Sequence, residues 1–249
     1  MKFHVFYTDN LPEQIRIDHQ ACCDKVGVEV RYHCFPTPED FHAIYRMHGD
    51  FMNEMMEKEK DEVVCFLDID CLPHDFVLLD HFYKWAKNKK SFVGNAQSHF
   101  ARGNHIYAAA SFLMVSKVAW DELGKPDLAY FEDENTKLID TAQKLSLVAD
   151  QANLRYRLLY PIGYDDRKQT WELGCYGYFG RGTLYPASWH YFRISDFKES
   201  IPVLWTTRVQ DILNGDQIQP NYPSLPYNLV NFKFSWRRLL LIFKKRKRL

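Results

Sequence analysis

The sequence lacks the run of about 18 to 20 apolar residues that a bilayer-spanning helix needs. Its apolar stretch at Leu239–Phe243 is far too short. The six cysteines show no paired Cys-x-x-Cys spacing, and Cys22 and Cys23 are adjacent. A zinc ribbon or a disulfide framework is therefore not expected, and reduced thiols in a cytosolic protein are. The N-terminal apolar stretch reaches Asp9 after a few residues, which predicts a first strand and not an export signal.

The chain also lacks net charge, because its 249 residues carry 32 Lys+Arg and 32 Asp+Glu. These charges are unevenly spread. No acidic residue follows Asp216, whereas residues 217–249 contain eight basic ones, so the first 216 residues carry a net charge of −8. The hydrophobic fraction of 46% is ample for a core and excludes a disordered chain. The sequence therefore predicts an acidic globular body with a basic tail.

The composition of the basic tail predicts a function separate from that of the acidic globular body. We expect a main domain at 1–216, a Pro-containing linker at 217–231 and a basic amphipathic tail at 232–249. As a helix, the tail would dip apolar side chains into the lipid headgroups and place its cations on anionic lipid. The basic run also permits a nucleic-acid arm or a nuclear signal. The apolar segment beside it favours an anionic membrane surface as partner, so no nucleic acid is expected. The protein would be cytoplasmic, or peripheral on the cytoplasmic face of a membrane.

Apolar periodicity predicts alternating strands and helices. We expect strands at 3–8, 28–33, 62–67, 92–94, 107–115 and 156–161, and helices at 12–25, 36–60, 73–88 and 136–153. Residues 170–192, rich in Gly and aromatics, predict loops and short strands. The alternation predicts an α/β fold, Rossmann-like, with a mostly parallel central sheet flanked by helices.

Two carboxylates follow the strand expected at 62–67. Asp68 and Asp70 are two residues apart, and such residues face the same side of an extended chain. Ligands of open α/β sheets bind at the carboxyl ends of strands. Two carboxylates aimed there would repel each other unless a cation lay between them. Mn²⁺ or Mg²⁺ suits such an oxygen-rich site and would also hold phosphates. A helix-capping Asp with a solvated neighbour is the alternative.

The segment Phe66–Asp70 resembles the Asp-x-Asp motif of the haloacid-dehalogenase-like phosphatases. That resemblance implies Asp68 as a nucleophile, with Asp165-Asp166 in place of the later acidic pair of that family. Two departures weaken it. Cys71-Leu72 replaces the small turn residue and the Thr or Val expected there, and the motif follows the third predicted strand and not the first.

Residues 3–195 resemble the glycosyltransferases of the GT-A fold more broadly. Phe6–Asn10 is similar to their nucleotide-contacting loop, and His48-Gly49-Asp50 to their nucleotide-contacting helix. Ala108–Gly124 resembles the segment after their DxD motif, where small residues line the donor-sugar pocket. The resemblance implies a GT-A-like catalytic domain that transfers a hexosyl or pentosyl group. The donor would be a nucleotide-diphosphate sugar, with a UDP-sugar favoured, and the acceptor a hydroxyl of a glycan or glycolipid.

The resemblance also implies roles for single residues. The nucleotide and its metal would be bound by Thr8, Asp9, His48, Asp68 and Asp70. A neutral His190 would be the third metal ligand, unless it is simply packed among its aromatic neighbours. The substrate would contact Ala110, Ser111, Trp171 and Arg181. The aromatic, Gly-rich segment 171–182 would form a sugar-binding wall, with Arg181 neutralising the diphosphate.

An inverting transferase needs a carboxylate that takes the proton of the acceptor hydroxyl. Three clusters compete for this role: Glu132-Asp133-Glu134, Asp140, and Asp150 followed by Gln151. We favour Asp140, in the helix expected at 136–153, because a carboxylate beside an apolar stripe is costly to bury without a purpose. Asp133 is the second choice, although it could equally cap a helix. A non-catalytic, membrane-associated protein that kept the fold is the remaining alternative.

Overall fold

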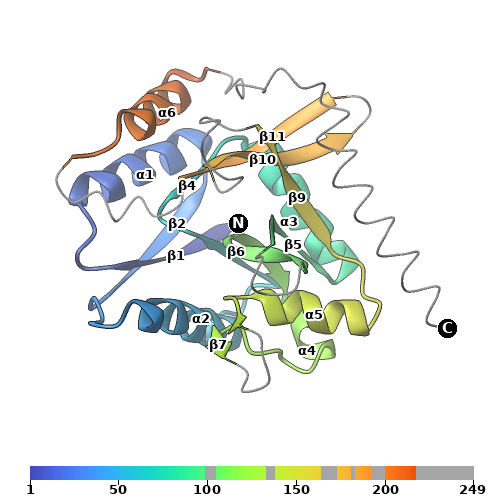
Figure 1. Cartoon of the computed structure of the whole chain (residues 1–249). Helices are drawn as coiled ribbons and strands as arrows, with labels where there is room; N and C mark the ends of the chain where they lie inside the picture. Colours follow the sequence, from blue (N-terminus) through green and yellow to red (C-terminus); the bar gives the residue numbers. More distant parts are fainter. Residues whose placement is uncertain (99–104, 133–137, 164–172, 181–182, 192–199, 217–249) are drawn as a thin grey trace.

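The computed structural model describes residues 1–98, 105–132, 138–163, 173–180, 183–191 and 200–216 (Figure 1). Its helices are α1 (Glu13–Val26), α2 (Phe41–Lys58), α3 (Phe76–Lys89), α4 (Lys117–Glu122), α5 (Gln143–Gln151) and α6 (Val203–Asn214). Its strands are β1 (Lys2–Thr8), β2 (Glu29–Phe35), β3 (Val63–Leu67), β4 (Cys71–Pro73), β5 (Phe92–Ser98), β6 (Ile106–Ser116), β7 (Phe131–Glu132), β8 (Leu138–Ile139), β9 (Arg157–Gly163), β10 (Leu173–Gly180) and β11 (Thr183–Tyr191).

Nine strands form one sheet in the order β2-β1-β3-β6-β5-β9-β10-β11-β4. β1 pairs in parallel with β2 and β3, and β5 pairs in parallel with β9. β6 is antiparallel to both of its neighbours, so β2, β1, β3, β5 and β9 all run in one direction. The far edge is an antiparallel extension made of β10, β11 and β4. The expected α/β fold, with a mostly parallel central sheet flanked by helices, is confirmed.

β3 shows how the sequence dictates a sheet covered on both faces. All five of its residues are buried. Val63, Cys65 and Leu67 belong to the hydrophobic cluster shared with α1, α3 and α6. Val64 and Phe66 belong to the cluster shared with α2, α4 and α5, and Figure 1 shows α1 and α6 on the opposite side of the sheet from these three helices. Because side chains alternate along a strand, a continuous apolar run is what burial on both faces requires.

The helix expected to begin at Pro73 begins later. Residues 71–73 form β4, an edge strand, where a proline is tolerated. α3 starts at Phe76, and the carboxylate of Asp75 caps it by accepting hydrogen bonds from the backbone N–H groups of Val77 and Leu78, at 2.8 and 3.2 Å. After the two carboxylates, the chain therefore returns into the sheet before it becomes helical.

The prediction of a helix at 136–153 was wrong for the described residues before Gln143. β8 ends at Ile139, and α5 begins only at Gln143. Between them Ala142 has φ 64°, a left-handed conformation that no residue of an α-helix adopts. The hairpin of β10 and β11 is longer than the short strands expected there, and α6 was not expected at all.

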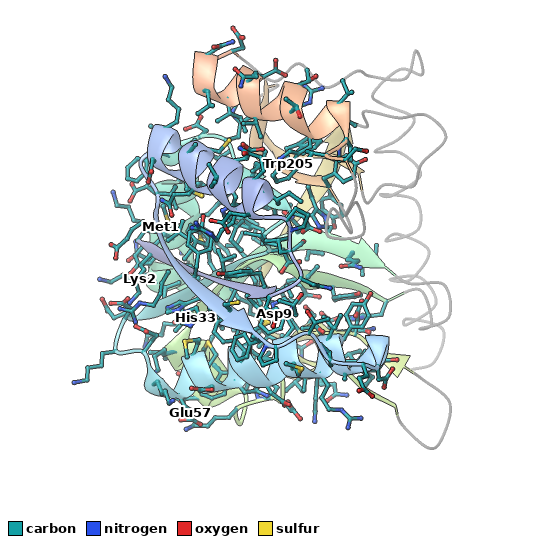
Figure 2. The ribbon with its side chains drawn as sticks, turned by 90° about the vertical axis from the view of Figure 1, so that its left-hand side faces the viewer. Met1, Lys2, Asp9, His33, Glu57 and Trp205 are labelled. Atoms are coloured by element: carbon teal, nitrogen blue, oxygen red, sulfur yellow. The ribbon has the colours of Figure 1, made fainter. Side chains whose placement is uncertain are left out.

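α6 covers α1 through a buried tryptophan. Trp205 is fully buried, and its indole Nε1 donates a hydrogen bond to Asp18 Oδ2 of α1 at 2.9 Å. Figure 2 shows Trp205 where the two helices face each other. The expected linker and tail at 217–249 lie outside the described residues. Within the described part of the chain, none of the helices has both the length and the apolar character needed to cross a bilayer.

Gly49 sets how closely α2 approaches the loop before β7. A Cβ on Gly49 would lie 2.2 Å from Ala129 Cα and 2.7 Å from the carbonyl oxygen of Leu128. Both neighbours are backbone atoms, so they cannot move aside by a change of rotamer. Only glycine permits this contact.

We expect Gly49→Ala to lower the free energy of unfolding by roughly 1–3 kcal/mol, because the added methyl group is overpacked. The direction of the change identifies the crowding, because a Gly→Ala change in an uncrowded helix raises the free energy of unfolding by about 1 kcal/mol. Urea titration measures this free energy. Gly124→Ala is a control for backbone strain alone, because Gly124 has φ 78° and no atom lies within 4 Å of an added Cβ. A stabilised Gly49→Ala protein would contradict the close contact.

Candidate functional site

The two carboxylates lie on a tight turn at the carboxyl end of β3. The backbone N–H of Cys71 donates to the carbonyl of Asp68 at 2.9 Å, which closes the turn. The N–H of Asp68 donates to the carbonyl of Ser111 in β6 at 3.0 Å, and the N–H of Tyr191 in β11 donates to the carbonyl of Asp70 at 2.8 Å. A turn held from two strands, and not the extended chain assumed from the sequence, therefore sets the positions of these carboxylates.

The pairing of β11 with β4 brings a histidine to this turn. His190 lies opposite Cys71 in the register of the two strands. Its Nε2 is 3.2 Å from Asp70 Oδ1, and its side chain is 8% exposed. One potential ligand atom from each of Asp68, Asp70 and His190 lies within 4.8 Å of the others. The structure thus brings together the three residues that the sequence analysis proposed as metal ligands.

The electrostatics of the turn favour a bound cation. Burial raises the pKa of Asp68 to about 7, and the negative charges of Asp70 and Asp140 act in the same direction, while His190 opposes them. A second negative charge in this position is thus unfavourable until a cation offsets it. Two carboxylates and an imidazole are ligands that Mn²⁺ accepts, and Mg²⁺ is compatible with the carboxylates. The residues present fit a divalent metal ion.

His48 contacts the same turn from α2. Its Nε2 is 3.6 Å from Asp68 Oδ1, and its ring stacks on Phe6 with centroids 4.9 Å apart and an interplanar angle of 13°. Burial lowers the pKa of His48 to about 4, so the ring is neutral at pH 7. The nucleotide contact expected for His48 remains a prediction.

Asp140 lies in the loop between β8 and α5, and not in a helix as expected. The hydroxyl of Tyr107, a fully buried residue of β6, donates a hydrogen bond to its Oδ2. The N–H of Thr141 donates to its Oδ1 at 3.0 Å, and its own N–H donates to Gln143 Oε1 at 2.9 Å. The left-handed Ala142 supports this loop conformation. Because its charge raises the pKa of Asp68, Asp140 belongs to the same electrostatic cluster.

Asp150, an alternative base in the sequence analysis, lies in the last turn of α5. Its Oδ2 is 3.3 Å from His105 Nε2, and its side chain is 48% exposed. Its charge is not among the causes of the shifted pKa of Asp68 or of His48. Asp140 is therefore the better placed of the two carboxylates.

The two small residues expected to line the sugar pocket lie where β6 leaves the register of β5. Gly94 pairs with Leu113 and the next residue of β5 pairs with Ala109, so Ala110 and Ser111 fall in the resulting bulge. The Ser111 hydroxyl accepts a hydrogen bond from Asn95 Nδ2 at 3.3 Å. Ser111 thus supports the carboxylate turn through its carbonyl while its side chain joins a buried polar contact. Its expected sugar contact stays a prediction.

The expected nucleotide loop is tied to the neighbouring strand. Asp9 Oδ1 accepts hydrogen bonds from Thr37 N at 3.0 Å and Thr37 Oγ1 at 2.6 Å, which lower the pKa of Asp9. Thr8 Oγ1 donates to Asn10 Oδ1 at 2.7 Å. Figure 2 shows Asp9 at the opposite end of β1 from Met1 and Lys2. Because β1 is parallel to β3, Asp9 and the carboxylate turn lie at the same end of the two strands.

Three proposed site residues, Asp133, Trp171 and Arg181, lie outside the described residues, as does Asp165-Asp166. Tyr107 and Asn95, which hold Asp140 and Ser111, were not expected as site residues. Tyr107 is the first residue of a predicted strand and Asn95 directly follows another, but their partners come from elsewhere in the chain.

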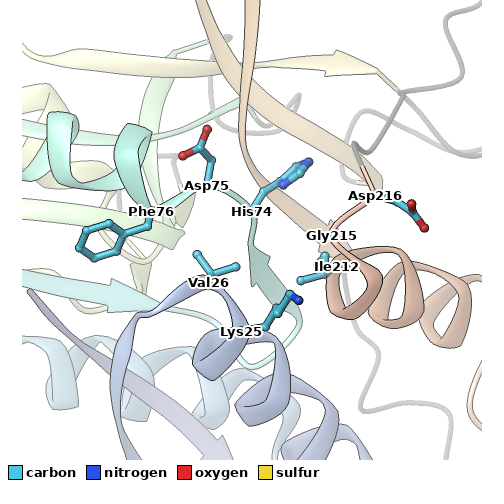
Figure 3. A pocket seen from close by; sticks show the side chains of 8 residues that line it. All are labelled: Lys25, Val26, His74, Asp75, Phe76, Ile212, Gly215 and Asp216. Carbon is cyan, nitrogen blue, oxygen red and sulfur yellow. The ribbon is translucent and has the colours of Figure 1, made fainter.

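A pocket of about 250 Å³ lies away from the carboxylates, at the ends of α1, α3 and α6 (Figure 3). Its lining is made by Lys25, Val26, His74, Asp75, Phe76, Ile212, Gly215 and Asp216. None of the site residues named above takes part in it. The carboxylate turn, and not this pocket, is the candidate functional site.

No protein-family model and no curated protein matches the chain. Solved structures similar to it include a Drosophila β1,4-galactosyltransferase 7 in complex with manganese, UDP-Gal and xylobiose, at 12% identity and TM-score 0.40, covering 63% of this chain and 64% of that one. The galactosyltransferase LgtC with donor and acceptor sugar analogues is similar at 11% identity and TM-score 0.40, over 89% of this chain and 98% of that one. A glycosyltransferase involved in glycosylation of the major capsid of PBCV-1 is similar at 12% identity and TM-score 0.40, over 66% and 85%. At these sequence identities and TM-scores, the similarity does not indicate an activity for this chain.

The raised pKa of Asp68 predicts a pH-dependent stability in the absence of metal. The folded-state pKa of about 7 exceeds the ordinary value of 3.8, so the fold prefers the protonated form. The penalty is absent at low pH, grows as pH rises above about 4 and is complete above 7. In a chelator, Asp68→Asn should raise the melting temperature at pH 8 and leave it little changed at pH 4. Glu39→Gln, an exposed carboxylate, is the matched control. An Asp68→Asn variant that is less stable than the wild-type protein at pH 8 would contradict an unfavourable burial of the Asp68 charge beside Asp70.

Proposed function

We propose that this chain is a metal-dependent glycosyltransferase with a GT-A-like fold. It would transfer a hexosyl or pentosyl group from a nucleotide-diphosphate sugar, with a UDP-sugar favoured, to a hydroxyl of a glycan or glycolipid. The observation that supports it best is the convergence of Asp68, Asp70 and His190 at the carboxyl end of β3. A carboxylate outside this triad, Asp140, is held nearby by hydrogen bonds.

Asp68, Asp70 and His190 would hold a Mn²⁺ or Mg²⁺ ion. When bound, such an ion neutralises a diphosphate and stabilises it as a leaving group. The chain contributes the positions of these ligands, since backbone hydrogen bonds from β6 and β11 fix the turn on both sides. Ligand positions fixed before substrate binds lower the cost of assembling the site.

Asp140 would accept the proton of the acceptor hydroxyl as that oxygen attacks the sugar carbon. This role needs an ionised carboxylate with a fixed orientation. The Tyr107 hydroxyl and the Thr141 N–H both donate to its oxygens. These two contacts would hold the carboxylate in place while an acceptor binds.

Binding of metal and nucleotide tests the proposal first. We expect UDP to raise the melting temperature when Mn²⁺ is present and to have little effect in a chelator. Asp70→Asn and His190→Ala should each remove most of this shift, because each deletes a ligand. Glu39→Gln should keep it. If no nucleotide diphosphate changes the melting temperature with Mn²⁺ present, or if Asp68-dependent hydrolysis of a generic phosphate ester is found instead, the proposal fails.

Asp140→Asn should lower kcat by about 10²- to 10⁴-fold, the usual contribution of a general base. The UDP-induced thermal shift should stay near that of the wild-type protein, because the Asn oxygen can still accept from the Thr141 N–H while its amide donates to the Tyr107 hydroxyl. Asp150→Asn is the matched control and should keep its activity. Sugar transfer from a panel of UDP-sugars to glycan acceptors gives the measurement. Equal losses of kcat in Asp140→Asn and Asp150→Asn would contradict the role of Asp140 as general base.

A further inference from the structure

A buried histidine lies beneath the carboxylate turn, outside the set of proposed metal ligands. His19, in α1, is fully buried. Its Nδ1 lies 2.7 Å from the hydroxyl of Tyr32 and 3.6 Å from Cys23 Sγ. Its Nε2 has no hydrogen-bond partner among the described residues. Buried polar atoms are rarely left in this state, so this nitrogen calls for a physical explanation.

The acceptors beside the ring determine which nitrogen carries the proton. The Tyr32 hydroxyl, 2.7 Å from Nδ1, can either donate or accept, whereas the backbone carbonyls of Cys71 and Asp68, which also neighbour His19, can only accept. A neutral imidazole carries one ring proton, and Nε2 is the nitrogen left to meet these carbonyls. The proton therefore lies on Nε2, and the Tyr32 hydroxyl donates to Nδ1. The unpartnered atom is therefore an N–H donor.

The turn supplies the acceptors around this histidine. α1 lies against β4, which begins at Cys71, and Ile15 and Cys22 of α1 belong to the hydrophobic cluster that contains Ile69 of the turn. The carbonyl groups of Cys71 and Asp68 and the charge of Asp70 oppose the effect of burial on the pKa of His19. The segment that presents the two carboxylates is thus the neighbour of the buried imidazole.

We propose that His19 is a positioning residue, whose Nε2–H supports the turn from Asp68 to Cys71 and keeps both carboxylates in their metal-binding arrangement. The inference rests on the metal site of the proposed function. A donor without another acceptor gains a hydrogen bond when a turn carbonyl closes on it, and metal ligation at the turn favours the same closed arrangement. Partners of metal-ligating segments act in this way on the metal, without touching it.

The test compares two amides at position 19. The amide nitrogen of Gln reaches about as far as Nε2 of histidine, whereas the amide of Asn reaches only as far as Nδ1. We expect His19→Asn to weaken Mn²⁺ binding by on the order of 10-fold. His19→Gln should restore affinity to within about 3-fold of the wild-type protein. Isothermal titration with MnCl₂ measures the affinity, and circular dichroism in a chelator measures the metal-free melting temperature.

Tyr32→Phe is the second variant, because it removes the donor at Nδ1 and leaves the histidine in place. It should weaken Mn²⁺ binding in the same direction, since the proton is then less strictly confined to Nε2. This variant also keeps the inference testable if His19→Asn does not fold. Unchanged affinity in Tyr32→Phe would overturn the tautomer on which the inference depends.

The outcomes separate the inference from the proposed function. If the wild-type protein binds no Mn²⁺, the metal site itself fails. If the wild-type protein binds Mn²⁺ and both position-19 variants bind it equally well, the positioning role is overturned. Equal losses in His19→Asn and His19→Gln, together with a lower metal-free melting temperature in both, would show a structural role only. A selective loss in His19→Asn at an unchanged metal-free melting temperature supports the inference.

Discussion

The site depends on holding two like charges next to each other. In the metal-free protein, burial raises the pKa of Asp68, and the negative charge of Asp70 raises it further. The fold supplies the constraint through the backbone: carbonyls and N–H groups of β6 and β11 fix the turn from two sides. These bonds use backbone atoms only, so they hold the turn without occupying the carboxylate oxygens. The electrostatic strain at this turn is what a bound cation would relieve.

The constraint links parts of the chain that are far apart in sequence. His190 reaches Asp70 only because β11 pairs with β4, over a separation of 120 residues. A register slip of one residue would turn this imidazole to the other face of the sheet. The helices contribute from outside the sheet. α2 carries His48, 3.6 Å from Asp68, and α1 carries His19, whose neighbours include the carbonyls of Cys71 and Asp68. The geometry of the site is therefore a property of the whole fold.

The sequence predicted what local patterns encode. The apolar run at 62–67 defines β3 whatever surrounds it, so the carboxylates at its end could be located, and the helix that carries His48 has a clear apolar period. Asp140 was correctly singled out but wrongly placed in a helix, because the left-handed Ala142 has no sequence signal of the kind that glycine provides. The hairpin of β10 and β11 and the contact of Tyr107 with Asp140 depend on pairing between distant segments, which periodicity does not reveal. Local order was thus predictable, and the arrangement of the side chains was not.

His48 and His19 add no positive charge to the turn at pH 7. Burial lowers the pKa of His48 and of His19 to about 4, so neither ring is charged at pH 7. A lysine in place of His48 would form a permanent ion pair with Asp68 and satisfy its charge. A neutral imidazole at 3.6 Å instead leaves that charge uncompensated. With such a neutral partner, the protein would fix where the carboxylates lie, and the proposed metal ion would bring the compensating charge.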